Sequence, residues 1–386
     1  QYNGTTNIAA SDISGITGTV NTETLTMSSG LGSTSSRNVG TYNLTDTSAG
    51  TLALGNGSNG GLASNYTLTG GTQDYTITQR ILNSSGSKTY DANTNALAGA
   101  ITLSNLVSGE ALNHSGTATI SSANAGSYTI SNLSGISIAD GSGGAASNYT
   151  LTGGTHNFTV NRRPVGVSGT RLYDATTNAV ASDLSTHANL VGSETLTLSG
   201  TGTIASKDVG SNKTVSVGTL ALGNGSNGGL AGNYTLSGGT HQLTVNQRPL
   251  NATLARQYDG TTAAAGSTLS SFDIQRVYDS GLNAEGSDLS SFDALQGGET
   301  LTMTGSGTAA SANLANGIAM SSNGNLALAD GTGAASNYSL NSAVINITKR
   351  VLNSSGSKTY DANTNALAGA ITLSNLVSGE ALNHPN

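Results

Sequence analysis

The chain has 386 residues, of which 53 are Gly and none are Cys or Trp, and 9% carry a charge, giving a formal net charge of −7. The lack of a basic excess excludes the electrostatic footprint of a nucleic-acid-binding protein. No apolar run approaches the length of about 18 residues that a membrane-spanning helix needs. The lack of Cys excludes disulfides, thiolate catalysis and Cys-ligated zinc.

Four sequence markers recur in a fixed order. An Asn-Tyr-(Thr/Ser)-Leu element contains Tyr66, Tyr149, Tyr234 and Tyr338, spaced 83, 85 and 104 residues apart. A Tyr-Asp pair occurs as Tyr90-Asp91, Tyr173-Asp174, Tyr258-Asp259 and Tyr360-Asp361, with the variant Tyr2-Asn3. A Glu in a Gly-Glu-(Thr/Ala)-Leu or similar context occurs at Glu23, Glu110, Glu194, Glu299 and Glu380, and an Arg closes each unit at Arg80, Arg163, Arg248 and Arg350. The markers predict tandem repeats, each long enough to be a small domain with its own core.

The repeat boundaries follow from these markers. We expect repeat 1 at 1–80, without its first strand, repeat 2 at 81–163, repeat 3 at 164–248, repeat 4 at 249–350 and a partial repeat 5 at 351–386. Repeat 4 is longer because it contains an internal duplication, in which Tyr278 follows Tyr258 by 20 residues. The partial repeat 5 copies repeat 2, since residues 352–384 are identical to residues 82–114.

Within a repeat, helix signals are nearly absent and strand signals are frequent. The segment from Glu194 alternates apolar and hydroxyl residues, as a half-buried strand does. The segment from Asn148 predicts a hairpin of two strands joined at Gly153-Gly154. The sequence therefore predicts an all-β chain of small antiparallel β-sandwich-like or mostly-β modules of about 85 residues, arranged end to end.

The repeat junctions lack a flexible linker. Pro164 and Pro249 directly follow the closing Arg163 and Arg248, and no Gly/Ser-rich stretch intervenes. We expect the last strand of one repeat to run almost directly into the first strand of the next, which favours a stiff array.

The ordered set of markers resembles YDG-type repeats and the related MBG repeats. The segments beginning "KTYDANTNA", "RLYDATTNA" and "RQYDGTTAA", each followed by "NYTL" or a close variant, carry this resemblance over essentially the whole chain. The sequence departs from the motif at Ala92, Ala175 and Ala362, which stand where the motif has Gly. The resemblance implies an extracellular all-β region of a large bacterial surface adhesin, such as a filamentous-haemagglutinin-like exoprotein, without naming a ligand.

The repeated carboxylates favour structural roles. Asp91, Asp174 and Asp259 are interpreted as turn residues that accept backbone N–H bonds after the strands of Tyr90, Tyr173 and Tyr258, because Asn3 replaces Asp in repeat 1 and cannot act as a general base. The repeated Glu residues could pair with these Asp residues as in a glycosidase. A hydrogen bond or ion pair near Lys or Arg at a strand end fits better, since a catalytic pair would have to be copied in every repeat.

Histidine and loop patterns give little support for a metal site. His156 and His241 share a Gly-Gly-Thr-His context, but Gln73 and Ala343 take this place in other repeats, so surface strand positions are expected for the five His residues. The Gly/Asn-rich loops contain one Asp or none, too few carboxylates for calcium. We expect no catalytic, cofactor-binding or metal site.

The sequence thus predicts a non-enzymatic extracellular stalk of a bacterial adhesin, or a matrix or fibre protein, located at the cell surface. The alternative is a direct binding module whose repeated loops contact carbohydrate or a host or matrix protein. The expected partners are neighbouring repeats, and either identical chains in a filament or a carbohydrate or host surface, with no nucleic acid and no membrane span. Tyr90, Tyr149, Tyr173, Tyr234 and Tyr258 are the aromatic structural markers of this prediction.

Overall fold

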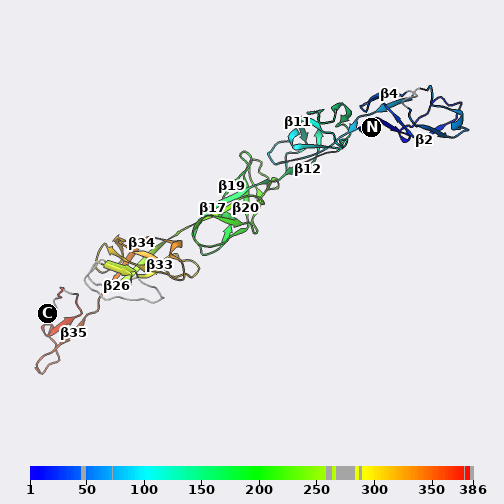
Figure 1. Ribbon diagram of the computed structural model, residues 1–386. Helices are drawn as coiled ribbons and strands as arrows, with labels where there is room; N and C mark the ends of the chain where they lie inside the picture. The colour runs from blue at the N-terminus through cyan, green and yellow to red at the C-terminus, as the bar shows by residue number, and fades with distance from the viewer. Residues whose placement is uncertain are drawn as a thin grey trace. The chain divides into compact units, whose positions relative to one another are not determined.

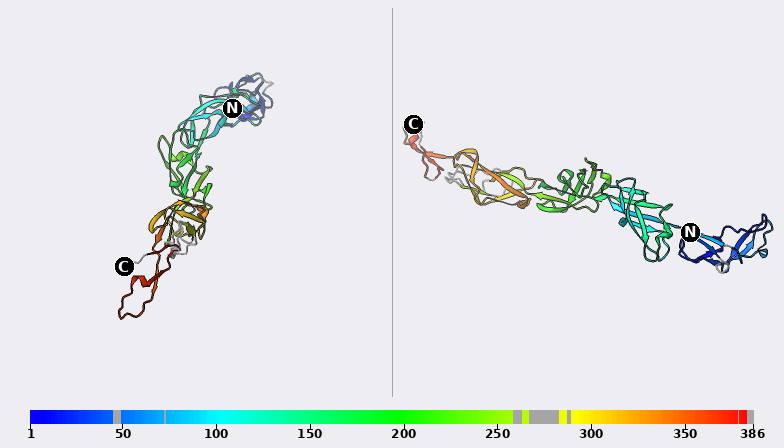
Figure 2. Two further views of the ribbon diagram at one scale, coloured as in Figure 1. Left: turned by 90° about the vertical axis from the view of Figure 1, so that its left-hand side faces the viewer. Right: turned by 90° about the horizontal axis from the view of Figure 1, so that it is seen from above.

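The computed structural model describes residues 1–44, 49–71, 73–257, 263–266, 283–286, 289–377 and 379–382. Strands, loops and three-residue 3₁₀ turns make up these residues, and none of them lies in an α-helix (Figure 1). The two views in Figure 2 show the same construction from strands and loops. The all-β prediction is confirmed, as expected from the low helix propensity of Gly, Ser, Thr and Asn. In the described ranges, no helix has the length and apolar character to cross a membrane.

The chain divides into two compact units. The first comprises Gln1–Pro164, Leu190–Glu194 and Ser226–Thr235, and the second comprises Val165–Asn189, Thr195–Gly225 and Leu236–Asn386. Two short stretches of repeat 3 therefore pack with repeats 1 and 2. These stretches contain the Glu and Asn-Tyr markers of repeat 3.

The main sheet of the first unit belongs to repeat 2. Its strand order is β10-β8-β15-β12-β11-β13, with β9 beside β11. The elements of this unit are β1 (Asn7–Ala9), η1 (Ala10–Asp12), β2 (Leu25–Ser29), β3 (Leu31–Ser33), β4 (Gly40–Leu44), β5 (Ala53–Asn56), η2 (Ala63–Asn65), β6 (Gln73–Ile77), β7 (Arg80–Ile81), β8 (Asn83–Thr89), β9 (Asn95–Leu97), η3 (Ala98–Ala100), β10 (Ile101–Ser104), β11 (Leu112–Ile120), β12 (Gly126–Asn132), β13 (Ile136–Asp140), η4 (Ala146–Asn148), β14 (Tyr149–Thr150), β15 (His156–Asn161), β16 (Arg163–Pro164), η6 (Ala231–Asn233) and β24 (Tyr234–Thr235).

The second unit contains one main sheet from repeat 3 and one from repeat 4. The strand orders are β18-β21-β22-β25-β17-β19 and β27-β28-β31-β32-β34-β26-β29. The elements are β17 (Gly166–Leu172), β18 (Asn178–Val180), η5 (Ala181–Asp183), β19 (Thr186–Ala188), β20 (Leu196–Ser199), β21 (Thr201–Ile204), β22 (Gly210–Ser216), β23 (Ala221–Asn224), β25 (His241–Asn246), β26 (Arg248–Gln257), β27 (Ala263–Gly266), β28 (Asn283–Gly286), β29 (Leu289–Phe292), β30 (Leu301–Thr304), β31 (Ser306–Ala309), β32 (Ala315–Ser322), β33 (Ala327–Asp330), η7 (Ala335–Asn337), β34 (Tyr338–Thr348), β35 (Asn353–Gly356), η8 (Ala368–Ala370) and β36 (Ile371–Ser374).

The first and last strands of a repeat lie side by side and run in the same direction. In repeat 2, β8 pairs in parallel with β15 from Ser84 opposite His156 to Thr89 opposite Asn161. The pairs β17 with β25 and β26 with β34 are also parallel. The sheets are therefore mixed rather than purely antiparallel, because the crossover through the middle of each repeat returns the chain in its original direction.

The hairpin predicted from Asn148 is wrong. The turn is present, since Gly153 has a φ of 87°, but the two strands that flank it do not pair with each other. Strand β14 pairs in parallel with β7, and β15 pairs with β8 and β12. A Gly-Gly turn reverses or redirects the chain locally, whereas the partner of each strand is chosen by long-range packing.

Repeat 4 shows the effect of removing that turn. Its Asn-Tyr element continues as Ser339-Leu340-Asn341-Ser342 without Gly. The two strands seen in repeats 2 and 3 are fused there into the 11-residue β34. Strand β26 follows it along its length, with one register shift between Leu250 and Asn251.

The core of each repeat consists of single side chains that alternate along the strands. In β15, His156, Phe158 and Val160 point inward and are buried, and His241, Leu243 and Val245 do so in β25. The surface positions expected for His156 and His241 are therefore wrong. Each Nε2 bonds to a backbone carbonyl, that of Leu151 or Leu236, which offsets the cost of burial.

Candidate functional site at the repeat junctions

A three-residue cluster joins each pair of consecutive repeats where the structure describes both sides. We call it a clasp, and it consists of the Tyr of a Tyr-Asp pair together with the Glu and the Asn-Tyr tyrosine of the next repeat. The three clasps are Tyr2–Glu110–Tyr149, Tyr90–Glu194–Tyr234 and Tyr173–Glu299–Tyr338. The first two lie within the first unit and the third lies within the second unit.

The second clasp shows the geometry. Tyr90 donates its hydroxyl to Oε1 of Glu194 at 2.8 Å, and Tyr234 donates to Oε2 of the same carboxylate at 2.7 Å. The rings meet edge to face with centroids 5.4 Å apart and an interplanar angle of 76°. The Val191 N–H donates to the Tyr234 hydroxyl at 3.0 Å. Both carboxylate oxygens are thus occupied as acceptors, and the aromatic edge contact adds its own stabilisation.

The other two clasps repeat this arrangement. The Tyr-to-Glu distances are 2.5 and 2.7 Å in the first clasp and 2.6 and 2.9 Å in the third. The ring centroids are 5.4 and 5.2 Å apart, again edge to face. The six tyrosines have exposed fractions of 3% or less. Two tyrosine-to-carboxylate hydrogen bonds, an edge-to-face ring contact and the burial of both tyrosines therefore recur at three junctions whose surrounding sequences differ.

A buried asparagine adds a second contact beside each clasp. Asn233, next to Tyr234, accepts the N–H of Ala125 at 2.8 Å and donates to the side chain of Asn124 at 3.0 Å. Asn148 makes the same pair of bonds to Val39 and Asn38, and Asn337 makes them to Val209 and Asp208. Because these asparagines are at most 2% exposed, their amides are satisfied only when the preceding repeat is in register.

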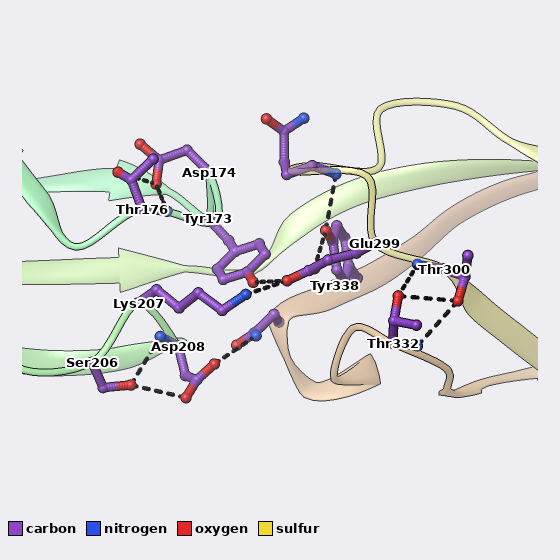
Figure 3. Close-up of polar contacts among 12 residues, drawn as sticks. Tyr173, Asp174, Thr176, Ser206, Lys207, Asp208, Glu299, Thr300, Thr332 and Tyr338 are labelled. Atoms are coloured by element: carbon purple, nitrogen blue, oxygen red, sulfur yellow. Dashed lines mark hydrogen bonds and ion pairs between the residues drawn. The ribbon is translucent and has the colours of Figure 1, made fainter.

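The third clasp carries an additional cation (Figure 3). Lys207 forms an ion pair with Oε1 of Glu299, and its Nζ lies 5.7 Å from the centroid of the Tyr173 ring. In the first clasp, Arg37 approaches Glu110 at 3.6 Å from the corresponding place. The second clasp has Ala123 at this position. Tyrosines and asparagine are thus common to all three clasps, whereas the cation varies.

Local turn chemistry places the first tyrosine of each clasp. Tyr90 follows β8, and its N–H donates to the Asn161 carbonyl of the last strand. Asp91 then accepts the N–H of Asn93 at 3.2 Å, and Ala92 between them has a φ of 62°. Asp174 and Asp361 accept N–H bonds in equivalent turns. Asp therefore shapes the turn that follows the tyrosine, without contacting the clasp carboxylate.

A basic side chain holds each of these turns. Lys88 donates to the carbonyls of Asn93 and Asn95 at 2.7 and 2.9 Å and pairs with Asp91 at 2.8 Å. Arg171 and Lys358 hold the corresponding turns in repeats 3 and 5. Since Lys and Arg serve equally, the requirement is for a cation that donates several bonds.

Burial and hydrogen bonding set the ionisation of the clasp. Burial, followed by the hydrogen bond to Glu194, raises the pKa of Tyr90 from its ordinary value of 10.0 to about 12. Burial is also the main cause that raises the pKa values of Tyr149, Tyr234 and Tyr338 to about 12. Burial alone would raise the pKa of Glu299, but the hydrogen bonds from Lys207, Tyr173 and Tyr338 outweigh it and lower this pKa. In the third clasp, Tyr173 and Tyr338 are therefore protonated donors to an ionised carboxylate at neutral pH.

Repeat 1 contains one half of a clasp. Tyr66 donates to Glu23, and the Val20 N–H donates to Tyr66 at 3.0 Å, as in the other repeats. Asn65 is exposed there, in contrast to the buried Asn148. The Tyr–Glu pair thus forms inside a repeat, and the second tyrosine is added by the repeat before it.

Most of the markers predicted from the sequence lie in or beside the clasps, and the structure adds the buried asparagine of the Asn-Tyr element to them. Tyr90, Tyr149, Tyr173 and Tyr234 meet in clasps, and Asp91 and Asp174 lie in the adjoining turns. Tyr258, Asp259, Tyr278 and His384 lie outside the described residues. The Glu was expected to contact Lys or Arg, and its two tyrosine donors were missed. Their joint recurrence in every repeat was the available signal.

Carboxylates and histidines do not gather into a metal-binding cluster of three or more in the part of the chain that the structure describes. In each clasp, both oxygens of the carboxylate accept tyrosine hydrogen bonds. What the arrangement provides is a fixed register between consecutive repeats.

Comparison with known proteins identifies the repeated unit. The YDG domain family matches the chain twice, at residues 71–156 and 159–242. No match to the chain was found among curated proteins or among solved structures. Each matched range contains a Tyr-Asp pair, a clasp Glu and all or part of the strands around them. The chain therefore contains two tandem YDG domains, whose Tyr-Asp elements supply the first tyrosines of the second and third clasps.

Proposed function

We propose that the chain is a segment of a non-enzymatic stalk that transmits mechanical force and holds other parts of a bacterial surface adhesin or fibre away from the cell. One observation carries this proposal: the first and last strands of repeats 2, 3 and 4 pair in parallel. The clasps support it by tying each repeat to the next through buried groups.

The parallel pairing determines how a repeat resists tension. The chain enters repeat 2 at the start of β8 and leaves it at the end of β15, and these two points lie at opposite ends of the paired strands. Tension therefore shears the ladder, so that its hydrogen bonds are loaded together. If the first and last strands paired antiparallel, the chain would enter and leave at the same end of the ladder. The hydrogen bonds would then be broken one after another and would yield at lower force.

Single-molecule pulling of the full chain tests the proposal. Unfolding of successive repeats should give force peaks spaced by roughly 270 Å, the extended length of about 80 residues. Forced unfolding reports the unfolding rate, so extension at low force without discrete peaks would contradict the proposal.

The absence of native Cys allows a matched control. Handles attached in the double variant Ile81→Cys, Arg162→Cys shear β8 against β15, whereas handles in Thr89→Cys, Arg162→Cys pull on neighbouring ends of these strands. The first pair should unfold repeat 2 at the higher force. Equal forces would show that the ladder does not carry the resistance.

The extracellular location is part of the same proposal. It rests on the YDG resemblance and on a fold that needs no disulfide. Protease treatment of intact cells that produce the tagged chain should remove it, and complete protection would argue for another compartment. Saturable binding of the full chain to glycans or host proteins would instead favour the alternative of a direct binding module.

A further inference from the structure

The buried side-chain nitrogens that lack a hydrogen-bond partner gather in repeat 3. Within the described residues these atoms are Nε of Arg171, Nε2 of His187 and Nδ1 of His241, and all three residues lie in the second unit. Native proteins leave few buried polar groups without a partner. Two of the three atoms belong to histidines, whose charge changes near neutral pH. This concentration therefore points to a response of repeat 3 to acid.

The two histidines flank Val167 on one face of the repeat 3 sheet. Strands β19, β17 and β25 are neighbours, and Val167 of β17 stands opposite both His187 of β19 and His241 of β25. Residues directly opposite each other in a sheet share a face, and Val167 and His241 are 1% and 7% exposed. The row His187–Val167–His241 therefore has a buried apolar side chain at its centre.

The corresponding row of repeat 2 is Leu103–Ser84–His156, with a hydroxyl at its centre. Nε2 of His156 lies 2.8 Å from the Leu151 carbonyl and therefore carries a proton, since a carbonyl only accepts. Nδ1 of the same ring lies 2.9 Å from Oγ of Ser84. A hydroxyl donates to Nδ1 when the ring is neutral and, after rotating, accepts from it when the ring is charged. His156 can therefore take up a proton without losing a hydrogen bond.

The histidines of repeat 3 lack this freedom. Nε2 of His241 lies 2.8 Å from the Leu236 carbonyl, so Nδ1 is the nitrogen that a further proton would occupy. Val167 stands where repeat 2 has Ser84, and the new N–H would be buried without an acceptor in the part of the chain that the structure describes. In a charged His187, the buried Nε2 would likewise carry an N–H without an acceptor there. A charged ring in either place therefore costs much more than a neutral one.

The charges described around this row do not favour a proton on either ring. The charged side chains on the elements packed against it are Arg171 on β17, Lys213 on β22 and Asp183 on η5. Arg171 and Lys213 are cations, which oppose a further positive charge. Asp183 pairs with Arg171 at 3.8 Å, and burial raises its pKa. Burial is also what lowers the pKa of His187 below its ordinary value of 6.5.

We propose that repeat 3 is an acid-sensitive module, which mild acid unfolds before repeat 2 because His187 and His241 cannot hold a proton in their folded positions. The folded state binds these protons more weakly than the unfolded chain does, so the stability of repeat 3 is complete well above about pH 6.5 and decreases as the pH falls. In repeat 2, His156 is served as described, and Nε2 of His114 lies 3.0 and 2.9 Å from the carbonyls of Ala98 and Ile101. This response to acid goes beyond the stalk function and does not depend on it.

Hydrogen exchange of the full chain at about pH 7.5 and about pH 5 tests the proposal, with each rate corrected for the intrinsic pH dependence of exchange. Protection of residues 241–246 should fall at least about tenfold, since a histidine that titrates near 6.5 only when unfolded can contribute up to about 30-fold at pH 5. Residues 156–161, the equivalent strand of repeat 2, should change less than about threefold. Protection of residues 241–246 that is equal at both pH values, or that is lost equally in the two strands, would overturn the proposal.

Replacing both rings assigns the effect to the histidines. His187→Leu introduces the residue that repeat 2 has at this place, Leu103, and His241→Gln introduces a neutral amide, as Gln73 does in repeat 1. The double variant should show no acid-induced loss of protection in residues 241–246. A full loss in the double variant would mean that carboxylates cause the acid response, and the proposal would be wrong.

A variant that keeps both histidines separates the proton effect from a general gain in stability. Val167→Thr supplies an acceptor for Nδ1 of His241, so the loss of protection between the two pH values should shrink. A rise in protection by the same factor at both pH values would instead show that the hydroxyl acts without regard to protonation, and would count against the role of His241. His156→Gln in repeat 2 is the matched control and should leave the acid response of residues 241–246 unchanged.

Discussion

Tyr90 and Tyr234 lie edge to face with ring centroids 5.4 Å apart, and each donates its hydroxyl to a different oxygen of Glu194. One tyrosine comes from repeat 2 and the other from repeat 3, so the carboxylate is shared across the repeat boundary. A surface ion pair at this place would contribute little. Buried hydrogen bonds to a charged group contribute more, because their loss leaves the carboxylate poorly solvated.

Removing the hydroxyl of Tyr90 should weaken the first unit. Tyr90→Phe keeps the ring contact and deletes one hydrogen bond to Glu194, which we expect to lower the free energy of unfolding by about 1.5–3 kcal/mol in urea titrations. Tyr128→Phe is the matched control, because the Tyr128 hydroxyl donates a solvent-exposed hydrogen bond to a backbone carbonyl, that of Asn124. Equal effects of the two variants would contradict a special role for the clasp.

The asparagine next to the third clasp gives a charge-dependent prediction. Asn337→Asp places a carboxylate against Asp208, whereas Asn233→Asp places one against neutral Asn124. The first variant should cost about 3 kcal/mol at neutral pH and more than the second. In the parent chain, the hydrogen bonds from Asn337 and Ser206 lower the pKa of Asp208. That stabilisation is present above the ordinary carboxyl pKa and is lost as the pH falls.

In the Asn337→Asp variant, the contact between residues 337 and 208 should change stability with pH in the opposite direction. Repulsion between the two carboxylates is greatest at neutral pH and decreases as one of them takes up a proton in acid. Thermal unfolding at several pH values should therefore show the gap between the two variants closing below about pH 4. A gap that does not change with pH would mean that Asp208 does not face residue 337 in solution.

The raised tyrosine pKa values predict loss of the clasps in alkali. Tyrosine in an unfolded chain titrates near 10.0, whereas Tyr90, Tyr149, Tyr234 and Tyr338 titrate near 12 when folded. Their contribution to stability is complete below pH 10 and is lost as the pH rises to about 12. The absorbance of tyrosinate should rise in two steps, the upper one together with loss of the β-sheet circular dichroism signal. A single step near pH 10 would contradict the buried clasps.

The turn after Tyr173 should be improved by glycine. Ala175 has a φ of 61°, where a Cβ atom is strained, and it occupies the Gly position of the YDG motif. Ala175→Gly should raise the free energy of unfolding by about 0.5–1 kcal/mol. Ala139, an exposed residue of β13 without a positive φ, is the control, and Ala139→Gly should be destabilising. Destabilisation by both would show that the turn is not strained.

A missing hydrogen bond in repeat 3 can be restored. In repeat 2, Oγ of Ser84 lies 2.9 Å from Nδ1 of His156, but the residue opposite His241 is Val167, and His241 Nδ1 has no partner within the described residues. Val167→Thr keeps the branched side chain and supplies a hydroxyl, so it should stabilise the second unit by about 1 kcal/mol. Ser84→Val is the reciprocal variant and should destabilise the first unit. Unchanged stability in both would mean that water already serves these nitrogens.

The local features of the fold could be predicted from the sequence because neighbouring residues determine them. The alternation of apolar and hydroxyl residues from Glu194 gave strands, and the absence of capped helical periods gave an all-β chain. The Tyr-Asp turn was also predictable, since Asp91 bonds to a backbone N–H two residues away.

The partners of these elements could not be predicted in the same way. Gly153 marked a turn, yet the pairing of β14 with β7 depends on a strand about 70 residues earlier in the chain. Glu194 and Tyr90 are 104 residues apart, and neither carries a local signal for the other. The inward direction of His156 was missed because its polar character suggested the surface, whereas Ser84 and the Leu151 carbonyl satisfy it inside.

The repeated set of Tyr, Glu, Tyr and Asn has a consequence for the history of the gene. If recombination removed residues 81–163, Arg80 would be followed by Pro164, and Tyr2 would meet Glu194, Tyr234 and Asn233 in place of their counterparts in repeat 2. The new boundary would hold every group that the old one held. The array can therefore lengthen or shorten by whole units while each boundary remains chemically complete, and the identical stretches 82–114 and 352–384 offer the homologous sequence for such exchange.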